Sequence, residues 1–202
     1  DKHSTLLDGP SFAKKMGDVN DATHTYPHTL SISWTDTLPS RLSDAYIVST
    51  PDSEVPTYAF LDPETQHDIF LYSEAAIVTA NTNCDHMFDG SSSACDFMNG
   101  GLFYKFDVMD RIDTSKVTSA DQMFANVGQY GGKLETLDLS HMDISSLKSA
   151  DSMFTNDGSI KTIYVNSKFD LSKFNSPGMF GGSQNLVGGK GTTPSQFTTE
   201  NP

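Results

Sequence analysis

Apolar residues recur at positions one, four and six of three related stretches in the second half of the chain. The residues at these positions are Phe103, Phe106 and Val108, then Leu134, Leu137 and Leu139, then Ile160, Ile163 and Val165. Side chains two apart on a strand point to the same face, so the last two positions of each set would face inward together. The spacing is typical of leucine-rich repeats, and it predicts one short strand at the start of each unit.

Each unit closes with a Met-Phe pair. The phrases "SADQMFAN" (119–126) and "SADSMFTN" (149–156) are nearly identical, and Met87, Met123, Met153 and Met179 are separated by 36, 30 and 26 residues. Spacings in this range are typical of repeat proteins, whose units must stack to bury their apolar faces. We expect the pairs to be buried knobs of the core, with a thioether ligand as the alternative. The pairs are Met87–Phe88, Met123–Phe124, Met153–Phe154 and Met179–Phe180.

The residues before each pair suggest a short helix. Ser119 and Ser149 are good N-cap residues, and each is followed two positions later by an aspartate, which a helix N-terminus favours. The predicted fold class is therefore α/β: a short leucine-rich-repeat-like solenoid with one short strand and one short helix per repeat, preceded by an N-terminal α+β cap.

Three regions follow from these patterns. Residues 1–74 are predicted to form the cap, with a helix beginning near Ser11 and short strands in "TLSISW", "AYIVST", "PTYAFLD" and "DIFLYS". Residues 75–187 hold the repeats. Residues 188–202 are rich in Gly, Thr, Ser and Pro, which is typical of a tail or linker.

The repeats resemble those of the BspA-like surface proteins of bacteria, a branch of the leucine-rich-repeat proteins. The resemblance is carried by "LDLSHMDISSLKSADSMF" (137–154) and "DTSKVTSADQMF" (113–124), and it extends to flanking segments such as "LLDGPSF" (6–12) and "NLVGGKGTT" (185–193). It implies a secreted or surface-displayed protein, often linked to adhesion, and it names neither a catalytic residue nor a ligand. The last unit departs from the pattern, because it has "SPGMF" (176–180) where "SADxMF" is expected, and Pro177 and Gly178 imply an altered terminal turn.

Charge narrows the choice of partners. The chain has 13 Lys and Arg against 26 Asp and Glu, a formal net charge of -13. Such a surface repels phosphate backbones and anionic lipids, so nucleic acid is a poor partner. The sequence has no apolar run of about 18 residues, so we expect no membrane insertion.

The two cysteines are a disulfide candidate. Cys84 and Cys95 flank a Ser- and Gly-containing loop, "CDHMFDGSSSAC", and such a pair in an exported protein suggests a local bridge. Two buried free thiols are the alternative.

A search for catalytic motifs finds none, so we expect a protein that is not an enzyme and has no metal site. His24 and His28 have a spacing that would suit a metal on a helix, but Pro27 lies between them. Calcium is the one candidate cofactor: "NTNCDHMFDGSS" from Asn81 carries oxygen ligands at several loop positions but lacks the glycine and glutamate of a calcium-binding loop.

The outward residues of the three predicted strands are the candidate ligand-binding face, with a column through Asp107, Asp138 and Tyr164. An ordinary solvated sheet face is the alternative. The functional hypothesis is an adhesin-like module that binds host or neighbouring-cell proteins; the alternatives are a carbohydrate-binding module that uses Trp34 or a structural spacer that displays other domains. The candidate residues are Tyr104, Lys105, Asp107, Glu135, Thr136, Asp138, Lys161, Thr162 and Tyr164.

Overall fold

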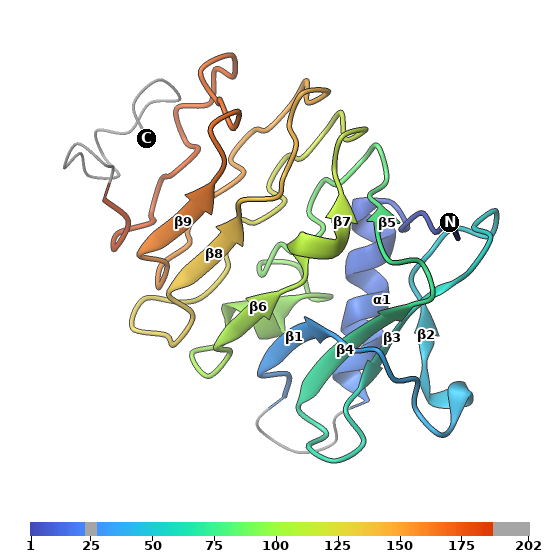
Figure 1. Ribbon diagram of the computed structural model, residues 1–202. Coiled ribbons are helices and arrows are strands. Elements are labelled where there is room, and N and C mark those ends of the chain that lie inside the picture. Colours follow the sequence, from blue (N-terminus) through green and yellow to red (C-terminus); the bar gives the residue numbers. More distant parts are fainter. Residues whose placement is uncertain (23–27, 188–202) are drawn as a thin grey trace.

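The computed structural model of the protein describes residues 1–22 and 28–187, and Figure 1 shows their arrangement. One α-helix and nine strands occur in these residues, with three short 3-10 turns, η1 to η3. In chain order the elements are α1 (Gly9–Asp21), β1 (Ser31–Trp34), η1 (Leu42–Asp44), β2 (Tyr46–Ile47), β3 (Thr57–Leu61), β4 (Asp68–Ser73), β5 (Val78–Thr79), η2 (Asp96–Asn99), β6 (Lys105–Asp107), η3 (Met109–Arg111), β7 (Ile112–Asp113), β8 (Thr136–Leu139) and β9 (Thr162–Val165).

Helix α1 is the helix expected near Ser11, and it begins two residues earlier, at Gly9. Asp8 is the N-cap, and its carboxylate accepts hydrogen bonds from the Ser11 amide and hydroxyl, both at 3.0 Å. Pro10 lies in the first turn, where its missing N–H has no intrahelical partner to lose. The helix buries Phe12 and Met16 in the core.

Small residues on α1 let its backbone approach the loop between residues 84 and 95. A Cβ atom placed on Gly9 would lie 2.1 Å from the Asp85 carbonyl oxygen, and one placed on Gly17 would lie 2.5 Å from the Ala94 carbonyl oxygen. Neither distance is compatible with a larger side chain. The helix is therefore seated directly on the first Met-Phe unit.

The largest sheet joins the two halves of the chain. Its strand order is β2-β3-β4-β1-β6, with β1 parallel to both β4 and β6 and with β3 antiparallel to its neighbours. Strand β6, from the repeat region, thus pairs with β1, where Ser31 lies opposite Lys105. Strands β5 and β7 form one small parallel sheet, and β8 and β9 form another.

The Met-Phe pairs stack on one another in the core. The rings of Phe88, Phe124, Phe154 and Phe180 lie in sequence, with centroid separations of 5.8, 5.9 and 5.6 Å and interplanar angles of 11°, 6° and 3°. All eight Met and Phe side chains of the four pairs are buried. Backbone hydrogen bonds keep the stack in register, because the amide of each of the first three phenylalanines donates to the methionine carbonyl of the next unit.

The predicted solenoid with one strand and one short helix per repeat is wrong. Instead, the described residues form a mixed α/β fold with one α-helix, a mixed five-stranded sheet and two small parallel sheets. Residues 121–126 and 151–156 form turns, and Ser119 and Ser149 before them form parallel β-bridges between units. Gln122 and Ser152 have φ values of 53°, in the left-handed region, which interrupts a right-handed helix.

The predicted caps make a different contact. The hydroxyl groups of Ser119 and Ser149 donate to the carboxylates of Asp85 and Asp121 in the preceding unit, both at 2.5 Å. The same carboxylates accept the amides of Asp121 and Asp151, both at 2.8 Å. The serine and aspartate of each Ser-Ala-Asp phrase therefore hydrogen-bond to the preceding unit. These bonds take the place of the local N-cap bonds that a helix would use.

Candidate functional site

The predicted ligand-binding residues lie in two different sheets. In β6, Lys105 and Asp107 are paired with Ser31 and Ser33 of β1. In the β8–β9 sheet, Asp138 is paired with Tyr164. The column predicted through three successive strands is therefore broken after Asp107, and only its Asp138–Tyr164 step is a cross-strand pair.

The remaining candidates form one small surface, which we call the β8–β9 face. It consists of Glu135, Thr136, Asp138, Lys161, Thr162 and Tyr164. Thr136 lies opposite Thr162, and the Lys161 ammonium donates to the Glu135 carboxylate at 3.0 Å. Hydrogen bonds from the Ser140 hydroxyl and amide lower the pKa of Asp138 below its ordinary value, so this carboxylate is charged at neutral pH.

Three tyrosines of the repeat region are largely exposed. Tyr104 precedes β6, Tyr130 lies in the loop before β8, and Tyr164 lies in β9; their exposed fractions are 52%, 71% and 55%. Tyr164 is the one that belongs to the β8–β9 face, where it is the cross-strand partner of Asp138. The face therefore offers both an aromatic surface and hydrogen-bonding groups.

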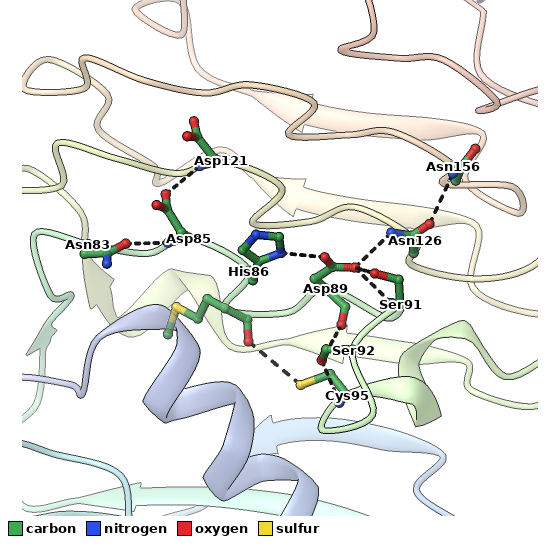
Figure 2. A network of polar contacts seen from close by, with 11 residues as sticks. Asn83, Asp85, His86, Asp89, Ser91, Ser92, Cys95, Asp121, Asn126 and Asn156 are labelled. Atoms are coloured by element: carbon green, nitrogen blue, oxygen red, sulfur yellow. Dashed lines mark hydrogen bonds and ion pairs between the residues drawn. The ribbon is translucent and has the colours of Figure 1, made fainter.

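A second polar group centres on Asp89, which directly follows Met87 and Phe88 (Figure 2). Its side chain is 1% exposed and accepts four hydrogen bonds: from His86 Nδ1 at 2.7 Å, from the Ser91 amide at 2.9 Å, and from the Ser91 hydroxyl and Asn126 Nδ2 at 2.8 Å each. Burial by itself raises the pKa of Asp89, but these bonds outweigh it and lower the pKa below the ordinary value.

The Asp89 network is built for linkage between units. The Asn126 side chain that donates to Asp89 also accepts a bond from Asn156 Nδ2 at 3.2 Å, so three successive units are joined (Figure 2). The Ser91 hydroxyl donates to Asp89 and not to His86, so the nucleophile–base contact of a serine hydrolase is not formed. Within residues 1–22 and 28–187, no cluster of three or more His, Cys, Asp or Glu side chains is arranged to hold a metal ion.

The cysteines are free and buried, so the predicted Cys84–Cys95 disulfide is absent from the structure. The Cys84 thiol is close to the Asn81 carbonyl oxygen, at 3.4 Å, and the Cys95 thiol is 3.7 Å from the Ala13 carbonyl oxygen. Burial raises the pKa of each thiol to about 12, so neither is a reactive thiolate at neutral pH. Of the two histidines considered as a metal pair, His24 lies outside the described residues.

Asp157 is a buried carboxyl group that sequence reasoning missed. Its Oδ1 atom accepts the Val127 amide at 3.0 Å, whereas Oδ2 has no hydrogen-bond partner among the described residues. Burial raises the pKa of Asp157 well above its ordinary value. Asp89 and Asp157 share one signal in the sequence, an Asp-Gly step soon after a Met-Phe pair, which could have marked both.

Trp34, the candidate stacking platform for a glycan, is held by its neighbours. Its Nε1 atom donates to the Val108 carbonyl oxygen at 2.8 Å, and the Arg111 guanidinium lies 4.4 Å from the ring centroid. One face of the indole is thus covered by a cation.

Comparison with known proteins found no matching family model, no matching curated protein and no matching solved structure. Among the described residues, no helix has the length and apolar character needed to cross a bilayer.

Proposed function

We propose that this protein is a non-catalytic binding module, secreted or displayed on a bacterial surface, that contacts a host or neighbouring-cell protein through the β8–β9 face. The observation that carries the proposal is the cross-strand pair of an exposed tyrosine, Tyr164, with a charged aspartate, Asp138. Surface display is supported by the repeat phrases that resemble those of BspA-like surface proteins.

The composition of the face suits protein recognition. A tyrosine offers a large contact area with little loss of side-chain freedom, and its hydroxyl adds a directional hydrogen bond. The paired threonines beside it have small side chains that allow close approach of a partner. Two carboxylates and one ammonium group leave the face with one excess negative charge, which favours a partner with a basic patch.

The backbone beneath the face is held in place. The four residues of β8 are paired in parallel register with the four of β9, and the Asn166 side chain donates to the carbonyl oxygens of Ser140 and Met142 at 3.0 and 2.8 Å. A surface that is already ordered loses less conformational entropy when it binds.

Binding to an array of purified extracellular-matrix proteins tests the proposal. For a protein that the wild type binds, Tyr164→Ala is expected to weaken binding about tenfold or more, the loss associated with truncation of an aromatic anchor. Asp138→Lys should weaken it as well, with a smaller effect at high salt, since salt screens exposed charges.

Tyr130→Ala is the matched control, because Tyr130 is an exposed tyrosine on a loop outside the face. Equal losses for the Tyr130 and Tyr164 variants would show that the placement is wrong. A wild-type protein that binds nothing on the array would contradict the function itself.

A further inference from the structure

An open groove of about 560 Å³ lies beyond the carboxyl ends of three parallel strands. Trp34 ends β1 and is followed by Asp36; Ser73 ends β4 and is followed by Glu74; and Arg111 lies shortly after β6. These residues and Ala76 line the groove. In open sheets with parallel strands, the carboxyl ends are where following loops gather binding groups, so the position itself favours a ligand site.

The charges of the groove are balanced. Arg111 is paired with Asp36, with 3.6 Å between nitrogen and oxygen, and Lys2 is paired with Glu74. The lining itself holds one guanidinium and two carboxylates, and the Lys2 ammonium that pairs with Glu74 from outside the lining brings the local sum of charges to zero.

The same groups still have unused hydrogen-bonding capacity. A carboxylate can accept about four hydrogen bonds, and the Asp36 side chain is fully exposed while that of Glu74 is half exposed. Arg111 donates from Nε to the Ala76 carbonyl oxygen at 3.0 Å and from a terminal nitrogen to the Ala75 carbonyl oxygen at 3.2 Å. A guanidinium has five N–H groups, so donors remain for a ligand.

The centre of the groove is rigid. Arg111 is fixed by two carbonyl oxygens and by the indole of Trp34, and Trp34 is fixed in turn by the Val108 carbonyl oxygen. A ligand that contacts this centre meets a preorganised surface, which reduces the entropy lost on binding. Ala76 and the part of the indole that lines the groove add an apolar surface.

We infer that this groove binds a neutral saccharide. Vicinal hydroxyl groups donate in pairs to a carboxylate, ring and hydroxyl oxygens accept from a guanidinium, and the C–H surface of a sugar ring packs on an apolar wall. The groove supplies all three kinds of contact without a net charge. This site is separate from the β8–β9 face, so it goes beyond the proposed protein-binding function.

Ligand binding in the groove can be followed at Trp34, since it is the only tryptophan in the chain and gives a single indole N–H resonance. Titration of the ¹⁵N-labelled protein with neutral hexose and N-acetylhexosamine oligosaccharides is expected to give a saturable shift of its indole N–H resonance, with a Kd of about 1 mM or tighter. A sulfated oligosaccharide and an oligolysine peptide serve as charged probes, and neither should match the affinity of the best neutral sugar.

Two variants and one control complete the test. Asp36→Asn and Glu74→Gln should each weaken sugar binding about tenfold, because each removes a charged hydrogen-bond acceptor; Asp36 is fully exposed, so its variant should keep the fold. Tyr164→Ala, on the β8–β9 face, should bind the sugar as the wild type does. The inference is overturned if no neutral sugar shifts the indole resonance at about 10 mM, if a charged probe binds more tightly, or if the Asp36→Asn/Glu74→Gln double variant retains wild-type affinity.

Discussion

Replacement of Asp157 by asparagine should stabilise the protein, although it alters a fully buried side chain that links repeat units. The carboxyl group is 0% exposed, its Oδ1 accepts the Val127 amide, and its Oδ2 has no partner among the described residues. Its backbone amide donates to the Ser183 hydroxyl, which donates onward to the Phe154 carbonyl oxygen. Asparagine keeps the Oδ1 acceptor and leaves the backbone bonds unchanged, but it cannot ionise.

The size of the effect follows from the pKa of Asp157, which burial raises in the folded protein. A carboxyl group of this kind binds its proton more tightly in the folded state, so its contribution to stability is complete below the unfolded pKa of about 3.9. That contribution is lost as the pH rises toward the folded pKa. At neutral pH the variant should be more stable by about 2 kcal/mol, because each pH unit by which the folded pKa exceeds the unfolded one costs the wild type about 1.4 kcal/mol, a cost that a side chain unable to ionise does not have. For a chain of this size, this raises Tm by about 4–8 °C.

Thermal unfolding of both proteins, followed by circular dichroism between pH 4 and pH 8, measures this difference. The advantage of Asp157→Asn should be near zero at pH 4 and should grow with pH. A difference in Tm that does not depend on pH, or a variant that is less stable at pH 8, would refute the reasoning.

Asp89→Asn is the matched comparison, because the pKa of Asp89 is lowered by its hydrogen bonds in spite of burial. Its charged form stabilises the fold above the unfolded pKa, and that contribution is lost as the pH falls. This variant should therefore be less stable than the wild type at pH 7, by about 2 kcal/mol, and should approach it in acid.

Two further substitutions test how the units and the helix are joined. Gly17→Val should destabilise the protein by about 1–3 kcal/mol in urea unfolding, because a Cβ atom at this position would lie 2.5 Å from the Ala94 carbonyl oxygen; an unchanged unfolding midpoint would mean that the helix does not pack this closely. Ser149→Ala should lower stability by about 1–2 kcal/mol through loss of its bond to Asp121, whereas the exposed Ser146→Ala should have little effect. Equal stability of the two serine variants would argue against the inter-unit bond.

Local reasoning about the Met-Phe units was right about burial and wrong about backbone conformation. The repeated apolar pairs are in the core, where Phe88, Phe124, Phe154 and Phe180 stack. A serine followed two residues later by an aspartate also looks like a helix start, because the local hydrogen bonds of an N-cap need only nearby residues. In the folded protein the same side chains bond to the neighbouring unit, a partner about 30 residues away that local propensity does not include.

For the candidate sites, too, local sequence patterns predicted some positions, whereas others depended on contacts between distant segments. The outward positions of β8 followed from the alternation of side chains along a strand, which is a local property. In β9 the same prediction is wrong, because Val165, expected to face inward with Ile163, is 44% exposed. The groove formed by Trp34, Asp36, Glu74 and Arg111 did not follow from any spacing in the sequence, because its residues come from loops after three separate strands. The parallel pairing of β1 with β4 and β6 brings those loops together.

The sequence by itself determined the composition of the core, the repeat units and the surplus of acidic charge, since these depend on residue type and period. Only the tertiary structure decided that residues 121–126 and 151–156 form turns, that β6 joins the sheet of β1, and that the two cysteines remain unbridged as buried thiols. The physical reason is common to all three. Each depends on which distant segment supplies the hydrogen-bond or packing partner, and that choice is made by the fold as a whole.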